Sequence, residues 1–307
     1  MAGLHVARQA VAQAGWSAAE LDEAVIVMGT SRGGVADWLN PWSERRALPL
    51  MAASNAMHGE AAAAISIELG IRGAYQVIST GCSAGIDAMG MAAMHLQCGM
   101  AERALVVAVD LPLVKALLDS YATTGILSKD SRNDPYHPKT SGIFPAEAAA
   151  ALTLEVGEAN GAPRMLGYLA NSDACDPLAL SADCGQLANL LARAARMFGA
   201  PHVLCPHATG TASHAVAEAA CLARAFPGVK PSLHLLKPYL GHGIGAGSLL
   251  ETVILVEFLR HQLVPANLPG LFCPDSFELP DEALPAAGTI FKIAASLGGH
   301  NAMVALR

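Results

Sequence analysis

The chain alternates short apolar runs rich in β-branched residues with longer helical stretches, a pattern typical of α/β proteins. Residues 74–80 (AYQVIST) predict a buried strand, and residues 85–99 predict a helix rich in Ala and Met that ends at Gly99. Residues 203–211 predict a strand that runs into a turn, and residues 232–259 predict a strand, a turn and a long apolar helix. Functional sites in α/β sheets assemble at strand ends, so we expect catalytic or binding residues in these turns.

Other segments fill out the same architecture. Residues 3–24 predict an amphipathic helix that ends near Gly15, and residues 24–34 predict a strand and a turn. A loop and a second amphipathic helix are expected over 173–199. Residues 261–288 are rich in Pro and predict an irregular segment before a final pair of strands.

Cys82 lies in STGCSAG (79–85), between the predicted strand and the predicted helix. The free N–H groups and the positive dipole end of a helix N-terminus favour a thiolate there. The small residues around it would let a substrate carbonyl approach the backbone. A buried structural cysteine in a tight turn explains the local sequence equally well.

His207 and His242 each follow a predicted strand, as Cys82 does. A single cysteine with histidines that are distant in sequence but near in the fold is the expected pattern of thiol-based acyl transfer. The two histidines therefore favour a nucleophilic role for Cys82 over a structural one.

Five segments together resemble the β-ketoacyl synthases of the thiolase-like fold, in that family's order and with its spacing. They are STGCSAG (79–85), SGIFPAEAAAALTLE (141–155), PHATGTASHAVAE (206–218), LKPYLGHGIGAGS (236–248) and ASLGGHNAMVAL (295–306). Any one match would be weak, but five in order over nearly the whole chain form a specific signal. The resemblance implies an α/β thiolase-like fold, with two pseudo-symmetric βαβ halves in an α-β-α-β-α layered sandwich.

The resemblance also implies a decarboxylative Claisen condensation in fatty-acid or polyketide-type biosynthesis. Cys82 would take an acyl chain from an acyl carrier protein or coenzyme A thioester. His207 and His242 would bind the carbonyl of a malonyl thioester and stabilise the enolate as carbon dioxide leaves. Neutral imidazole N–H groups aimed at a developing oxyanion contribute roughly 3–4 kcal/mol each. No cofactor is expected beyond the phosphopantetheine that the substrates carry.

Supporting residues follow from the same resemblance. Lys237, five residues before His242, would orient that histidine and balance charge with Glu147 or Glu218. The backbone N–H groups of Cys82 and Leu297 would form an oxyanion hole, and Leu297, Gly298 and Gly299 would form the gate. Thr209 and Thr211 would bind the pantetheine arm of the substrate.

The chain departs from the family pattern around these residues. The glycine usual after the first histidine is Ala208, the aspartate expected eight residues after that histidine is Ala215, and the bulky gate residue is Leu297. His214 and His300 occupy positions where the family usually has other residues, and we expect structural or pocket-lining roles for them. These changes put the substrate class in doubt more than the reaction type.

Composition restricts the partners. A net charge of −7 argues against nucleic-acid binding, and 53% hydrophobic with 15% charged residues predicts a homodimer or a heterodimer with a related chain. An acidic carrier protein would need a local basic patch, for which density along the chain suggests Arg32, Arg45, Arg46, Lys129 and Arg132. The seven cysteines lack metal-site spacing, so no metal is expected. Without a leader or an 18-residue apolar span, we expect a cytoplasmic protein with no membrane span.

Residues 76–90 and 234–248 share one strand–turn–helix form. This predicts two similar halves, 1–160 with the nucleophile turn and 161–307 with the two histidines, acting as one catalytic unit. A link is expected near 160–172, where Gly and Pro cluster. The family usually opens with a further strand, expected to be central in the first half, so the start suggests either a late annotated start or a short variant with an open sheet edge.

Two alternatives to a condensing enzyme remain open. A non-elongating partner subunit, similar to a chain-length factor, would shape the pocket of a companion synthase, although such partners usually lose the nucleophile. An acyltransferase or hydrolase would use the cysteine without decarboxylation, although such enzymes tend to alter one of the two histidines.

Overall fold

A computed structural model describes residues 1–47, 50–157, 161–176, 181 and 184–307. The chain forms two compact units. Unit 1 comprises Met1–Tyr121, Ala146–Ala159 and Gly243–Val253, and unit 2 comprises Ala122–Pro145, Asn160–His242 and Ile254–Arg307. Relative to the predicted division at residue 160, the segment Ala122–Pro145 belongs to unit 2, and the first half of helix α11 (Ile244–Arg260) belongs to unit 1.

Unit 1 contains a four-stranded sheet in the order β2-β1-β3-β4. Its strands are β1 (Val25–Gly29), β2 (Tyr75–Ile78), β3 (Arg103–Asp110) and β4 (Ala148–Glu155). β1 pairs in parallel with β2 and β3, and β4 runs antiparallel to β3. The apolar runs of β1 and β3 show no polar alternation, as expected for strands that helices cover on both faces.

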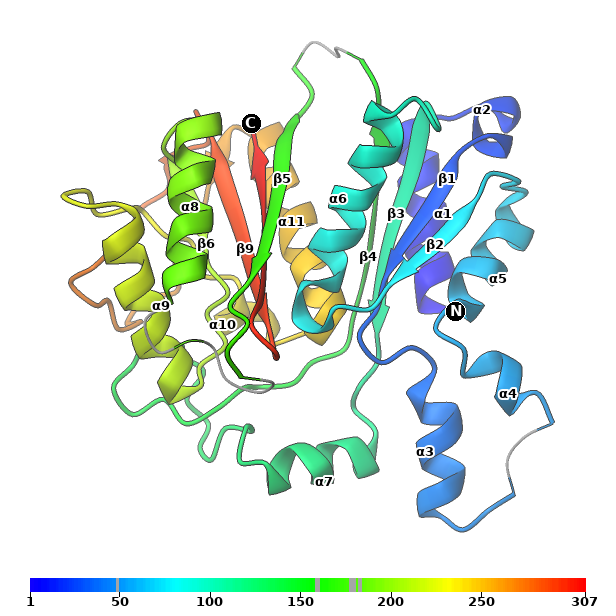
Figure 1. The fold of residues 1–307 in the computed structure, drawn as a ribbon, viewed down its shortest axis with the longest axis horizontal. Coiled ribbons are helices and arrows are strands. Elements are labelled where there is room, and N and C mark those ends of the chain that lie inside the picture. The colour runs from blue at the N-terminus through cyan, green and yellow to red at the C-terminus, as the bar shows by residue number, and fades with distance from the viewer. Residues whose placement is uncertain (48–49, 158–160, 177–180, 182–183) are drawn as a thin grey trace. The chain divides into compact units, whose positions relative to one another are not determined.

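Helices α1 (Ala2–Ala14) and α5 (Glu60–Leu69) pack on one face of this sheet, and α6 (Ala84–Gln97) contacts β1 and β3 (Figure 1). Gly15, with φ 68°, ends α1 where the sequence predicts. The predicted strands at 24–34 and 74–80 and the predicted helix at 85–99 are likewise confirmed as β1, β2 and α6.

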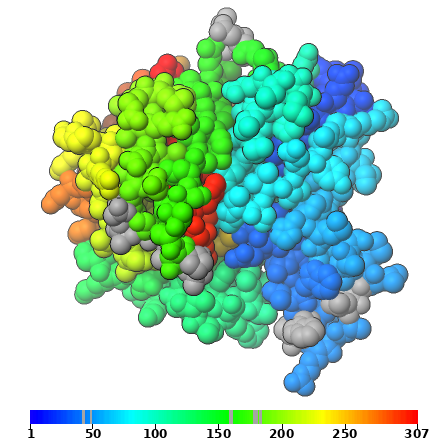
Figure 2. Space-filling view, in the orientation of Figure 1, coloured from blue at the N-terminus to red at the C-terminus, as the bar shows by residue number. Residues whose placement is uncertain are grey.

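The remaining helices of the first part of the chain are short: α2 (Ala18–Asp22), α3 (Val35–Ser43), α4 (Ala52–Asn55) and α7 (Lys115–Thr123). The segment that carries α3 and α4 extends away from the sheet of unit 1 (Figures 1 and 2). Several of its apolar side chains are exposed, among them Trp38, Met51 and Met57.

Unit 2 contains a sheet in the order β5-β10-β9-β6, with strands β5 (Met165–Ser172), β6 (Val203–Cys205), β9 (Ile290–Ser296) and β10 (His300–Leu306). β6 and β9 are parallel, and β10 is antiparallel to both β9 and β5. Helices α8 (Gly185–Phe198) and α9 (Ala212–Ala225) pack together beside it. The final strand pair is confirmed, and residues 261–288 contain only the short strands β7 (Leu263–Val264) and β8 (Leu284–Pro285) among the described residues.

The two sheets repeat one topology: β1, β3 and β4 correspond to β6, β9 and β10. Two expectations are corrected here. Residues 165–172 form strand β5 rather than a link, because Gly161 and Pro163 interrupt only the entry to an otherwise apolar segment. Residues 232–236 form isolated bridges, such as Leu204 with Leu233, rather than a full strand.

Helix α6 and the first half of α11 pack backbone to backbone within unit 1. A Cβ atom on Gly85 would lie 2.8 Å from the Leu249 nitrogen, and one on Gly245 would lie 2.8 Å from the Gly81 carbonyl oxygen. Glycine is therefore required at both positions. None of the helices in the described ranges has the length and hydropathy needed to cross a bilayer.

Gly245→Ala should lower the free energy of unfolding by about 1–3 kcal/mol, because the added methyl group would overlap Asp110 Oδ2 at 2.6 Å and the Gly81 carbonyl. Gly247→Ala is the matched control: it lies on the same helix with no atom within 4 Å of its added Cβ, so it should raise stability by up to about 1 kcal/mol. Urea unfolding at neutral pH measures both. Equal effects in the two variants would contradict the close approach.

Candidate active site

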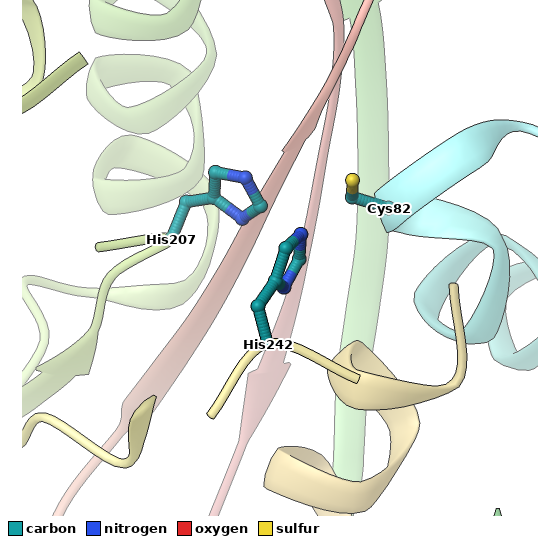
Figure 3. A group of neighbouring side chains, drawn as sticks. All are labelled: Cys82, His207 and His242. Atoms are coloured by element: carbon teal, nitrogen blue, oxygen red, sulfur yellow. The ribbon is translucent and has the colours of Figure 1, made fainter. Parts of the chain in front are cut away.

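Cys82 lies between a strand and the start of a helix, as the sequence predicts. β2 ends at Ile78, residues Gly81–Ser83 form the short 3-10 turn η1, and α6 begins at Ala84. Gly81 has φ 71°, a left-handed conformation that permits the sharp turn. Cys82 is half-buried, so its thiol combines partial solvent access with a position at a helix N-terminus (Figure 3).

Asp87, in the first turn of α6, braces this turn. The hydroxyl groups of Thr80 and Ser83 both donate to Asp87 Oδ2, the latter at 2.8 Å, and Ser83 Oγ also lies 3.1 Å from the Thr80 carbonyl oxygen. The residues on both sides of Cys82 are thus attached to one buried carboxylate.

Asp110, at the end of β3, joins the turn after β1 to the start of α11. Its carboxylate accepts from Thr30 Oγ1 and from the backbone N–H groups of Ser31, Arg32 and Ala246, at 2.9–3.2 Å. Burial raises the pKa of Asp110, and these hydrogen bonds only partly oppose that rise. The carboxylate therefore holds the first turn of α11 in place within unit 1.

The two predicted histidines lie together in unit 2. His207 follows β6, and His242 follows the short helix α10 (Lys237–Leu240). The His242 backbone N–H donates to the Phe144 carbonyl at 2.6 Å, which brings the segment 141–145 beside it. Both imidazoles are almost fully buried, and their ring centroids are 5.5 Å apart at 86° (Figure 3).

Burial lowers the pKa of His207 well below its usual value. The neighbouring basic groups Lys237, His214, His242 and Lys292 lower it further. His207 is therefore neutral at physiological pH and can donate one ring N–H group, which is the protonation state that the sequence analysis requires of it.

Glu218 holds the main chain at His207. Its Oε1 accepts from the His207 N–H at 2.7 Å, and its Oε2 accepts from the Ala208 N–H at 2.9 Å and the Tyr136 hydroxyl at 2.8 Å. Burial raises the pKa of Glu218, but His214 and these hydrogen bonds outweigh burial and bring the pKa to about 2. Glu218 is thus a fully buried carboxylate that stays charged.

Left-handed backbone lies next to both histidines. Ala208 has φ 46°, and Ile244, two residues after His242, has φ 49°. This conformation costs a residue with a Cβ roughly 1–2 kcal/mol, and most for a β-branched one. Backbone strain of this kind gathers at functional sites, where the surrounding contacts hold it.

The start of α11 connects His242 to the nucleophile turn along the chain. His242 is bonded to Gly243, which belongs to unit 1. In that unit Gly245 lies against the Gly81 carbonyl, so that His242 is three residues from a glycine that touches the residue before Cys82.

The predicted supporting, gate and pantetheine-binding residues lie on different elements and differ in exposure. Lys237 is buried in unit 2, whereas Glu147 is exposed in unit 1 just before β4. Leu297, Gly298 and Gly299 form the turn between β9 and β10, with Leu297 exposed and both glycines at positive φ. The two remaining residues, Thr209 and Thr211, are half-buried in the turn between His207 and α9.

Sequence patterns did not single out three buried charged residues near these turns: Asp87, Asp110 and Lys292. Lys292 is fully buried in β9 and donates to the carbonyls of Pro206, at 3.2 Å, and Ile293, at 2.7 Å. Its signal is a single lysine within the apolar run TIFKIAAS. The carboxylates gave no comparable signal, because an Asp at a strand or helix end is common in turns.

Cys82 in unit 1, and His207 and His242 in unit 2, each have a side chain of a type that zinc binds. The acyl-transfer interpretation uses the same atoms as nucleophile and proton donors. That the protein works without a metal or cofactor stays a prediction.

Two family models match the chain. The N-terminal domain of β-ketoacyl synthases matches residues 1–159, and the C-terminal domain matches residues 164–270.

Among curated proteins, 3-oxoacyl-[acyl-carrier-protein] synthase 2 of Mycobacterium bovis is 25% identical over 277 residues, which cover 83% of this chain and 66% of the relative. Putative polyketide beta-ketoacyl synthase 1 of Streptomyces halstedii is 27% identical over 237 residues, which cover 72% of this chain and 54% of the relative. The chain thus spans slightly under two thirds, or less, of the length of these relatives.

Solved ketosynthases share the fold. A type II polyketide ketosynthase in complex with its acyl-carrier protein (AntDE:AntF) matches with a TM-score of 0.90 and 21% identity over 99% of this chain and 83% of that one. The ishigamide ketosynthase/chain length factor matches with a TM-score of 0.86 and 23% identity over 99% and 81%. The predicted thiolase-like α/β fold is confirmed. Because domain models match in order over most of its length, the chain belongs to the β-ketoacyl synthase family.

Proposed function

We propose that this chain catalyses decarboxylative Claisen condensation of an acyl group on Cys82 with a malonyl thioester, in fatty-acid or polyketide biosynthesis. The observation that carries the proposal is the buried pair of His207 and His242, with His207 held neutral by burial and by neighbouring cations. A neutral imidazole N–H group can stabilise a developing enolate without giving up its proton.

The first half of the reaction is transfer of the acyl chain. The Cys82 thiolate attacks the carbonyl of an acyl thioester, and the carrier thiolate leaves with the electron pair of the broken C–S bond. The backbone N–H groups of Cys82 and Leu297 are proposed to bind the oxyanion, with Gly298 and Gly299 giving the gate its turn. Thr209 and Thr211 are proposed to bind the pantetheine arm.

The second half is condensation. Carbon dioxide leaves the malonyl thioester, and the electron pair of the broken C–C bond forms an enolate whose oxygen accepts from His207 and His242. The enolate carbon then attacks the acyl carbonyl and releases the Cys82 thiolate. Lys237, buried five residues before His242, is proposed to orient that histidine. Glu218 matches the proposed supporting role better than Glu147, because Glu218 is buried and bonded to the His207 loop.

An acyl carrier protein is the proposed donor, since one structural relative is a ketosynthase in complex with its carrier. Of the predicted basic residues, Lys129 and Arg132 are exposed, while Arg32 bonds to Tyr121 and Arg46 pairs with Glu44. A second ketosynthase-like chain is the proposed dimer partner, as another relative is a ketosynthase/chain length factor. A cytoplasmic location stays a prediction.

Incubation with acyl thioesters should place one acyl group on the wild type and none on Cys82→Ala, because the thiolate is the nucleophile. Addition of malonyl-carrier protein should then convert the adduct to a β-ketoacyl product, which intact mass and product mass spectrometry measure. Hydrolysis or transfer without a β-ketoacyl product would favour the acyltransferase alternative. The absence of any adduct, with or without a companion synthase, would favour the silent partner.

Condensation by pre-acylated enzyme should be insensitive to pH between 7.5 and about 6.5. Acylation removes the titration of Cys82, and His207 loses its neutral form only well below its usual pKa. Single-turnover rates after mixing with malonyl-carrier protein measure this. A rate that falls as pH drops through 6.5, with a native circular dichroism spectrum, would contradict the neutral donor.

Glu218→Gln should lower the free energy of unfolding at pH 7 by about 3 kcal/mol, since the pKa of about 2 in the folded chain lies below the ordinary glutamate pKa of 4.5. A lowered carboxyl pKa stabilises the fold above pH 4.5, and this contribution is lost as pH falls from 4.5 to about 2. The difference from the wild type should shrink over that range in urea unfolding. A difference that is independent of pH would show that packing, not charge, is involved.

A further inference from the structure

His214 occupies a position that the sequence analysis assigned only to structure or pocket lining. It lies in the first turn of α9 and is 6% exposed. Its Nε2 is 3.1 Å from Glu218 Oε2, four residues further along the helix. Its ring meets the His207 ring edge to face, with centroids 5.0 Å apart and an interplanar angle of 83°.

The carboxylate of Glu218 contacts both the His207 main chain and the His214 ring. Glu218 Oε1 holds the His207 main chain, and Oε2 is shared by Ala208, Tyr136 and His214. The His207 loop is therefore fixed through its backbone, and the His207 ring is packed by a second ring that is attached to the same carboxylate. Two independent contacts then restrict the orientation of one imidazole.

The charges around His207 come from four elements. Lys237 on α10, His242 before α11 and Lys292 on β9 are the other basic groups that act on it, and α9 contributes His214 together with Glu218. Of these groups, His214 both touches the ring of His207 and pairs with the carboxylate.

His214 also lies next to a residue at which this chain departs from the family pattern. The aspartate that the family usually carries eight residues after the first histidine is Ala215 here, which is buried and apolar. The neighbouring residue His214 supplies a polar side chain to the same loop. A polar side chain that contacts His207 and Glu218 thus lies next to the position where the family usually has an aspartate.

We propose that His214 is a positioning residue for condensation: paired with Glu218 and packed edge to face on His207, it holds the His207 ring in the orientation needed to donate to the enolate. The inference rests on the proposed function of His207. Acylation of Cys82 does not require this donor, so His214 acts on the second half of the reaction.

Two substitutions separate the two contacts. His214→Phe keeps the ring against His207 and removes the partner of Glu218, whereas His214→Gln keeps an amide donor for Glu218 and removes the ring. Ser213→Ala, at an exposed position on the same turn of α9, is the matched control. Urea unfolding of all three identifies any loss of folding.

Condensation by pre-acylated enzyme should fall about 10- to 100-fold in both His214 variants, because misplacement of a catalytic donor by about 1 Å has that effect. Acylation of Cys82 should stay within about threefold of the wild type. Loss of the neighbouring base should raise the pKa of His207, so the acidic limb of the condensation profile should move to higher pH. Ser213→Ala should match the wild type in all three measurements.

NMR titration of the His207 ring measures the expected rise in the pKa of His207 without the need for turnover. A His207 titration and a condensation rate that match the wild type in both variants would overturn the inference, as would equal losses in acylation and condensation. If the wild type acylates but never condenses, the proposed function fails, and the His207 titration alone then decides whether His214 positions that ring.

Discussion

The close packing of α6 against the first half of α11 is the constraint on which the candidate site depends. Gly85 and Gly245 let two helix backbones approach to a distance that no side chain would permit. One of these helices begins two residues after Cys82, and the other begins two residues after His242. A larger residue at either glycine would displace a helix start and with it a reactive side chain.

Buried charge is the second requirement of the site. Unit 2 contains two buried lysines, Lys237 and Lys292, close enough to His207 to lower its pKa, together with the buried carboxylate of Glu218. Isolated buried ions are expensive, so each needs partners. Glu218 accepts from two backbone N–H groups and one hydroxyl, and Lys292 donates to two carbonyls. Burial of His207 and the charges of these two lysines act in the same direction, and both lower the pKa of His207.

Local patterns predict the parts of this molecule that local interactions determine. The helix that ends at Gly15, the strand and turn at Cys82, and the strand pair at the C-terminus follow from apolar runs and from the preferences of glycine. Strand β5 was predicted as a link, since its pairing with β10 joins residues more than 120 positions apart, as in Asn171 with Asn301. The roles of Asp110 and Lys292 also depend on distant partners, so a sequence gives their identity but not their contacts.

The departures from the family pattern acquire a physical meaning in the structure. Ala208 stands where the family usually has glycine and adopts a positive φ, so the backbone of the His207 loop is strained at this position. Two hydrogen bonds from this loop to Glu218 hold it there, and His214 pairs with the same carboxylate. Glu218 matches the family's motif, so the main-chain contacts of this loop come from a residue of the expected type, and the histidine at position 214 is the departure beside it.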